Sequence, residues 1–164
     1  MYLKNYQIKV VKALKAFYSR AHATRTEVEK AAIALPQHLR HSLNWVSETF
    51  KELGYTVVDS PMTGLGFFYP RVVIKVPTGG GKTLLAVEAI REYQNLFVQR
   101  KTGLVVWVVP SETIYSQTLK KLRDKGNYLR QLLDQASGGN TLILEKDNDY
   151  RETTSNKTSS YCSL

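Results

Sequence analysis

The chain has 164 residues, of which 43% are hydrophobic and 23% are charged, and its net charge is +9. This composition is typical of a folded domain and argues against wholesale disorder. No run approaches the roughly 18 apolar residues of a membrane span, the N-terminus lacks the pattern of a secretory signal, and a single cysteine excludes an internal disulfide. We therefore expect a cytoplasmic protein without a membrane partner, whose basic surface favours polyanions such as phosphates or nucleic acid.

The first third of the chain has helical periodicity. Residues 3–20 carry apolar side chains at spacings of three and four, and a second helical stretch covers about 24–35. Pro36 separates it from a third stretch, which ends near Leu53. Residues 54–70 hold several glycines and prolines, so this segment is expected to be a connecting loop.

From residue 71 onward the pattern alternates between strands and helices. The sequence predicts strands, the first two of them buried, at Arg71–Val76, Leu104–Val109 and Thr141–Glu145, and helices at Leu84–Phe97, Glu112–Asp124 and Tyr128–Ala136. This order is typical of an α/β fold in which crossover helices connect the strands of a parallel sheet. We therefore predict four regions: a helical segment at 1–53, a loop at 54–70, an α/β unit at 71–145 and a polar tail at 146–164.

The tail is dense in small polar residues and cannot bury much apolar surface, so we expect it to be disordered. Cys162 lies within this tail and is expected to be exposed and functionally silent.

A glycine-rich segment lies between the first predicted α/β strand and the next predicted helix. It reads Thr78-Gly79-Gly80-Gly81-Lys82-Thr83 and matches the Gly-Lys-Ser/Thr end of the phosphate-binding loop motif. The glycines let the backbone wrap around phosphates, so that successive N–H groups and the positive end of the helix face one anion. Lys82 is expected to reach the β and γ phosphates, and the Thr83 hydroxyl is suited to Mg²⁺. The common form of this motif has a glycine at the position of Val76, so the chain departs from it there.

The segment Val76–Thr83 resembles the first motif of superfamily-two helicases and translocases. Gln7 stands where that superfamily has a glutamine that reads the adenine edge of ATP, through an amide that carries both a donor and an acceptor. Leu104–Pro110 and the residues after it resemble the next motif, which implies contact with the nucleic-acid backbone through Pro110, Ser111 and Gln117. Ser111 is also suited to capping the helix that follows it. Tyr6, on an amphipathic helix, is expected in the core.

Across about residues 1–145 the chain is similar to the res subunit of type III restriction enzymes and its helicase relatives. The similarity consists of a Tyr-Gln pair near the N-terminus, a long helical insertion, and the run from Pro70 to Ala86. It implies an incomplete RecA-like P-loop NTPase sheet preceded by a helical segment. It also implies ATP and Mg²⁺ as cofactors, Lys82 as a catalytic residue, double-stranded DNA as a partner and a DNA-modifying subunit as a second one.

Phosphoryl transfer also needs an acidic residue to hold Mg²⁺, and the family supplies it from an Asp-Glu-x-His element. No Asp-Glu pair occurs in this sequence, and Glu145, at the end of a predicted strand, is a weak imitation of one. We therefore expect the ATP-binding N-terminal part of a DNA-directed motor, truncated before that element. A non-catalytic nucleotide-binding remnant, a small P-loop kinase and a pure DNA-binding module stay open as alternatives.

Overall fold

The longest element is α1, a single helix from Asn5 to Ile33. The computed structural model describes residues 3–36, 39, 43–56, 60–145 and 160–163. The sequence predicts two helical stretches where α1 is continuous, and the reason lies in its buried side. Buried residues recur every three or four positions through the expected break, in the order Gln7, Val11, Leu14, Phe17, Ala21 and Thr24. One stripe therefore packs inward along most of the helix, which ends before Pro36.

Helix α2, Trp45–Glu52, packs against α1 and starts later than the third predicted helical stretch. Asn44 caps it by accepting a hydrogen bond from the Ser47 N–H at 3.0 Å, while residues 37–38 and 40–42 lie outside the described residues. Helix α2 shares an aromatic-rich core with α1 and with the end of the helix after the glycine-rich loop. Its buried members are Phe17, Ala21, Trp45, Val46 and Phe97.

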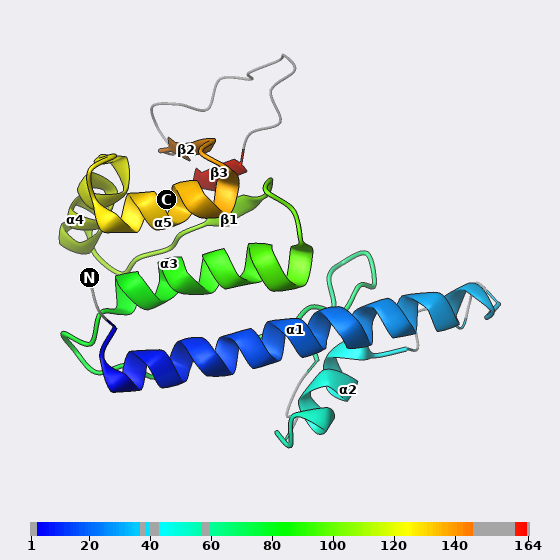
Figure 1. Ribbon diagram of the computed structural model, residues 1–164. Helices are drawn as coiled ribbons and strands as arrows, with labels where there is room; N and C mark the ends of the chain where they lie inside the picture. Colours follow the sequence, from blue (N-terminus) through cyan, green and yellow to red (C-terminus); the bar gives the residue numbers. More distant parts are fainter. Residues whose placement is uncertain (1–2, 37–38, 40–42, 57–59, 146–159, 164) are drawn as a thin grey trace, which may run out of the picture.

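Helix α3, Lys82–Glu92, lies between α1 and α5 (Tyr128–Ser137) (Figure 1). It continues into a π-helical turn, η2, at Tyr93–Val98, so the helix predicted over Leu84–Phe97 is confirmed with a wider last turn. Glu88 and Glu92 are buried on α3, where Arg91 and Lys15 pair with them. Burial raises the pKa of the Glu88 carboxyl.

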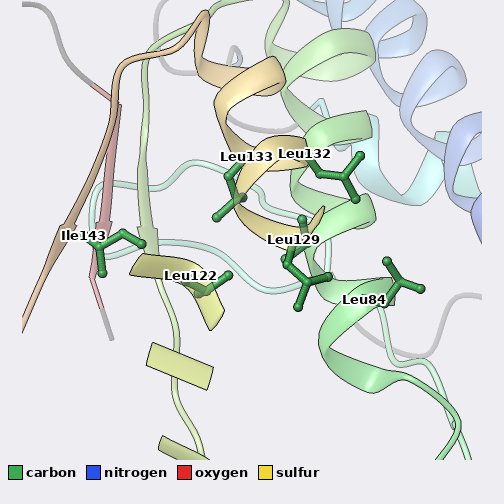
Figure 2. Packing of buried hydrophobic residues seen from close by; sticks show 7 residues of the cluster. Leu84, Leu122, Leu129, Leu132, Leu133 and Ile143 are labelled. Carbon is green, nitrogen blue, oxygen red and sulfur yellow. The ribbon is translucent and has the colours of Figure 1, made fainter. Parts of the chain in front are cut away.

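A second core joins α3 to α4 (Glu112–Arg123), α5 and the strand after it (Figure 2). Its buried members are Leu84, Val87, Leu122, Leu129, Leu132, Leu133 and Ile143. Arg130 of α5 ties the same elements together, donating to the Leu122 carbonyl oxygen at 3.2 Å and to the Thr141 carbonyl oxygen at 2.8 Å. α4 and α5 confirm both helices predicted after residue 110. The sequence predicts them well because their caps and apolar stripes are local signals.

The described strands are short. β1 (Leu104–Val106), β2 (Thr141–Leu144) and β3 (Ser160–Ser163) pair in parallel in the order β1-β3-β2, beside α5 (Figure 1). β3 falls in the region predicted to be a disordered tail, so that prediction is wrong for Ser160–Ser163. Residues 146–159 and 164 lie outside the described residues.

The predicted strand at Arg71–Val76 does not form in the structure. Its apolar side chains are largely exposed, and Val73 retains 79% of its accessible surface. The second predicted strand is shorter than expected, and Leu104 and Val106 are exposed rather than buried. A strand is buried only when it has hydrogen-bonded neighbours and a layer on each face. Among the described residues Arg71–Val76 pairs with no strand, and β1 pairs with β3 but keeps Leu104 and Val106 exposed. The RecA-like sheet is therefore not confirmed by these strands.

The described residues of the segment predicted as a loop, 54–56 and 60–70, form no helix, and an isolated bridge links Met62 and Phe68. Among the described helices, none is long and apolar enough to cross a bilayer.

Candidate nucleotide-binding site

The glycine-rich segment forms a tight turn at the start of α3. The Gly80 N–H donates to the Pro77 carbonyl oxygen at 3.0 Å, which closes the turn. Gly79 and Gly81 have φ values of +72° and +76°, in the left-handed region that favours glycine. Gly81 is the N-cap of α3, so the unpaired N–H groups and the positive dipole of that helix lie directly after the turn.

Gly80 is required for a different reason, which is space. A Cβ at this position would lie 2.6 Å from Val76 Cγ1 and 2.8 Å from the Pro77 carbonyl oxygen. Val76 is the residue that departs from the common motif, and here its side chain packs directly against the turn. The departure therefore leaves the turn intact, because Gly80 provides the room that the valine takes.

The two polar side chains of the motif follow the turn. Lys82 is exposed, and its Nζ donates to the Pro77 carbonyl oxygen at 3.2 Å, so the ammonium reaches back to the start of the turn. Thr83 lies half-buried in the first turn of α3. A Cβ at Gly79 would meet nothing within 4 Å, so this side of the turn is open. A cation, a hydroxyl and a helix N-terminus beside open space fit a phosphate group with Mg²⁺.

The N-terminus of α1 is bound to this turn. Gln7 is only 4% exposed, and its Nε2 donates to the Gly80 carbonyl oxygen at 3.1 Å. Its Oε1 accepts from the Lys4 N–H at 2.8 Å. The structure thus places Gln7 against the loop, with a partner within the chain at each end of its amide. Its reading of adenine, which the resemblance implies, stays a prediction.

Tyr6 is the residue that sequence reasoning missed at this site. It is expected in the core, yet its hydroxyl donates to the Gly80 carbonyl oxygen at 2.6 Å. The two residues are 74 positions apart, and no local pattern signals a contact of that kind.

The residues expected to touch nucleic acid lie on another element. Ser111 caps α4 and accepts from the Ile114 N–H at 3.4 Å, which confirms its capping role. Pro110 and Ser111 are exposed at the start of α4, and Gln117 is exposed further along the helix. These side chains are accessible to a partner, and their contact with DNA stays a prediction.

Glu145, the weak candidate for a metal-binding acid, already has two side-chain partners within the chain. Its Oε2 accepts from the Tyr115 hydroxyl at 2.5 Å, and its Oε1 lies 2.5 Å from Arg123 Nη2. The hydrogen bond to Glu145 is the main cause that raises the pKa of Tyr115 to about 12. This carboxylate links the end of β2 to α4. Among the described residues, no three acidic, histidine or cysteine side chains cluster as a metal site.

A groove of about 370 Å³ lies between α1, α2 and the segment before the loop. Its lining is mostly apolar and includes none of residues 77–83, so it is separate from the nucleotide site. The lining residues are Val10, Ala13, Leu14, Phe17, Phe50, Tyr55, Arg71, Val72, Val73, Ile74 and Lys75.

A family model described as the type III restriction enzyme res subunit matches residues 1–161. The chain belongs to this family. The match covers the α1 N-terminus, the glycine-rich turn and α4, and it extends the resemblance beyond residue 145. Membership of the res-subunit family supports a helicase-like, ATP-binding N-terminal part of a restriction system. Comparison with curated proteins and with solved structures gave no match.

Replacing Gly80 with alanine is expected to weaken ATP binding at least about tenfold, because the new Cβ forces the turn to open against Pro77 and Val76. Isothermal titration with ATP and Mg²⁺ measures this loss. Gly64→Ala is the matched control, since a Cβ there meets nothing within 4 Å and its φ is not positive. An unchanged dissociation constant in folded Gly80→Ala protein would contradict the importance of this turn.

Proposed function

We propose that this chain is the ATP-binding N-terminal part of a DNA-directed helicase or translocase of the res type, with a RecA-like P-loop NTPase fold. The observation that carries the proposal is the closed turn at 77–81 leading into α3, with Lys82 and Thr83 at the helix start. Family membership over almost the whole chain supports the same assignment.

In this proposal each residue of the turn has a defined task. Lys82 binds the β and γ phosphates and supplies positive charge during phosphoryl transfer. The N–H groups of Thr78, Gly79 and Gly81 and the first turn of α3 hold the phosphate oxygens, while the Gly80 N–H keeps the turn closed. Thr83 presents its hydroxyl to Mg²⁺, which neutralises phosphate charge when it is bound. Gln7 reads adenine with the second N–H of Nε2 and the second lone pair of Oε1, since its two present hydrogen bonds use one of each.

DNA binding is proposed for the exposed residues at α4, namely Pro110, Ser111 and Gln117. The positive charge of the N-terminal region supports this, since residues 1–50 hold eight basic side chains and three acidic ones. The family context favours double-stranded DNA and, as a partner, a DNA-modifying subunit.

A second candidate function is nucleotide binding without turnover. The observation that favours it is the engagement of Glu145 by Tyr115 and Arg123, which leaves this acid already paired rather than facing a metal. Hydrolysis by the described residues alone would then lack an acidic Mg²⁺ ligand.

The decisive experiment measures the melting temperature with and without ATP and Mg²⁺. A ligand present at 100 times its Kd stabilises the folded state by about 2.7 kcal/mol, which raises the melting temperature of a domain this size by several degrees. No shift at millimolar ATP would overturn the proposed function. ATP hydrolysis with and without duplex DNA then separates the two candidates, because DNA-stimulated turnover excludes the binding-only function.

A further inference from the structure

The Gly80 carbonyl oxygen accepts two hydrogen bonds from one end of α1. The Tyr6 hydroxyl donates at 2.6 Å and Gln7 Nε2 donates at 3.1 Å. Figure 1 shows the blue start of α1 beside the green loop that leads into α3. A carbonyl oxygen has two lone pairs, so both acceptor positions of Gly80 are used by α1.

These two bonds fix the orientation of a peptide group that glycine leaves free. The peptide between Gly80 and Gly81 is planar and trans, so its carbonyl and its N–H point in opposite directions. With the Gly80 carbonyl held toward α1, the Gly81 N–H points away from α1. Because both flanking residues are glycines, rotation of this peptide meets little steric resistance on its own.

The packing around the contact is close. A Cβ at Gly81 would lie 2.6 Å from Gln7 Nε2, so α1 approaches the turn as nearly as glycine allows. The amide of Gln7 is itself held by the Lys4 N–H, and Gln7 is buried. Tyr6 adds the shorter of the two bonds from a half-buried position.

We propose that Tyr6 is a positioning residue of the phosphate loop. Its hydroxyl, together with Gln7, holds the Gly80–Gly81 peptide in the orientation that presents the Gly81 N–H to a phosphate group. This inference rests on the proposed function, and it adds that α1 docking sets the affinity for the phosphate tail rather than for the base. The ligand class is therefore any linear tri- or diphosphate with Mg²⁺.

Tyr6→Phe tests this inference, because it retains the ring and removes only the hydroxyl. The Kd for ATP with Mg²⁺ is expected to rise about three- to tenfold, the effect of one neutral hydrogen bond. The Kd for inorganic tripolyphosphate, which has no base, is expected to rise by the same factor. Tyr55→Phe is the matched control, since that side chain is more than half exposed and lies outside the turn.

A second measurement needs no ligand. The amide resonance of Gly81 in a ¹⁵N correlation spectrum is expected to shift in Tyr6→Phe and to stay in place in Tyr55→Phe. Unchanged Kd values for both phosphates in Tyr6→Phe would overturn the inference, as would a loss confined to ATP, which would assign Tyr6 to base recognition. Failure of the wild-type protein to bind either phosphate would instead overturn the proposed function.

Discussion

Lys82→Ala is expected to abolish most of the rise in melting temperature that ATP and Mg²⁺ produce. The exposed ammonium reaches over the turn to the Pro77 carbonyl oxygen, and in the proposed function it is the charged side chain that binds the phosphates. Hydrogen bonds to charged groups contribute about 1.5–3 kcal/mol each, so the affinity should fall about ten- to hundredfold. Thermal unfolding at fixed ATP concentration measures the loss as a smaller shift.

The control for this prediction removes a lysine charge elsewhere. Lys125→Ala deletes an exposed cation between α4 and α5 and should leave the ATP-induced shift intact. In the absence of nucleotide, Lys82→Ala should melt close to the wild-type temperature, since one long contact to a carbonyl oxygen contributes little. An ATP-induced shift of wild-type size in Lys82→Ala would place the nucleotide away from this turn.

The elements that the sequence predicts well are those with local signals. α4 begins after a serine cap and α5 ends at Gly138, whose φ is +66°, and both ends depend on residues a few positions away. The turn before α3 is also local, because its glycines and the following helix are adjacent in sequence. The continuity of α1 was not predicted, although its buried stripe is present in the sequence at the right spacing.

The strands depend on partners that no local pattern identifies. Arg71–Val76 has the composition of a buried strand, yet β-branched residues only favour a strand that has neighbours. In the described residues the neighbour of both β1 and β2 is β3, from a segment with little apolar content. Which segments pair as strands therefore depends on contacts between distant parts of the chain, and not on how hydrophobic each segment is.

The site shows the same division. The residue types of the turn predict a phosphate-binding loop, and the resemblance assigns Gln7 to the adenine of the same nucleotide. The contact of Tyr6 with Gly80 joins positions 74 apart through a hydroxyl and a backbone oxygen. Neither the periodicity around Tyr6 nor the glycine run contains that information, so only the structure reveals it.

Leu122→Ala is expected to cause the largest loss of stability among these substitutions, about 2–5 kcal/mol. Leu122 is fully buried on α4, in the core that also contains Leu84 and Val87 of α3 (Figure 2). Truncating this side chain leaves a cavity in a packed interior and forfeits the transfer free energy of the removed atoms. The expected loss is a large part of the 5–15 kcal/mol that is typical of a domain's free energy of unfolding. Urea unfolding measures the loss as a lower midpoint.

Ile114→Ala is the matched control for Leu122→Ala, because Ile114 lies on the same helix and is 42% exposed. Its unfolding midpoint should stay near that of the wild type, and equal losses in the two variants would contradict the core described here.

Since Leu84 lies two residues after Lys82 and packs in the same cluster, Leu122→Ala should also loosen the first turn of α3. Saturating ATP with Mg²⁺ binds only the folded state, so it should restore part of the lost stability in Leu122→Ala. The same addition should restore little in a protein that also carries Lys82→Ala, which connects the core of the fold to the phosphate loop.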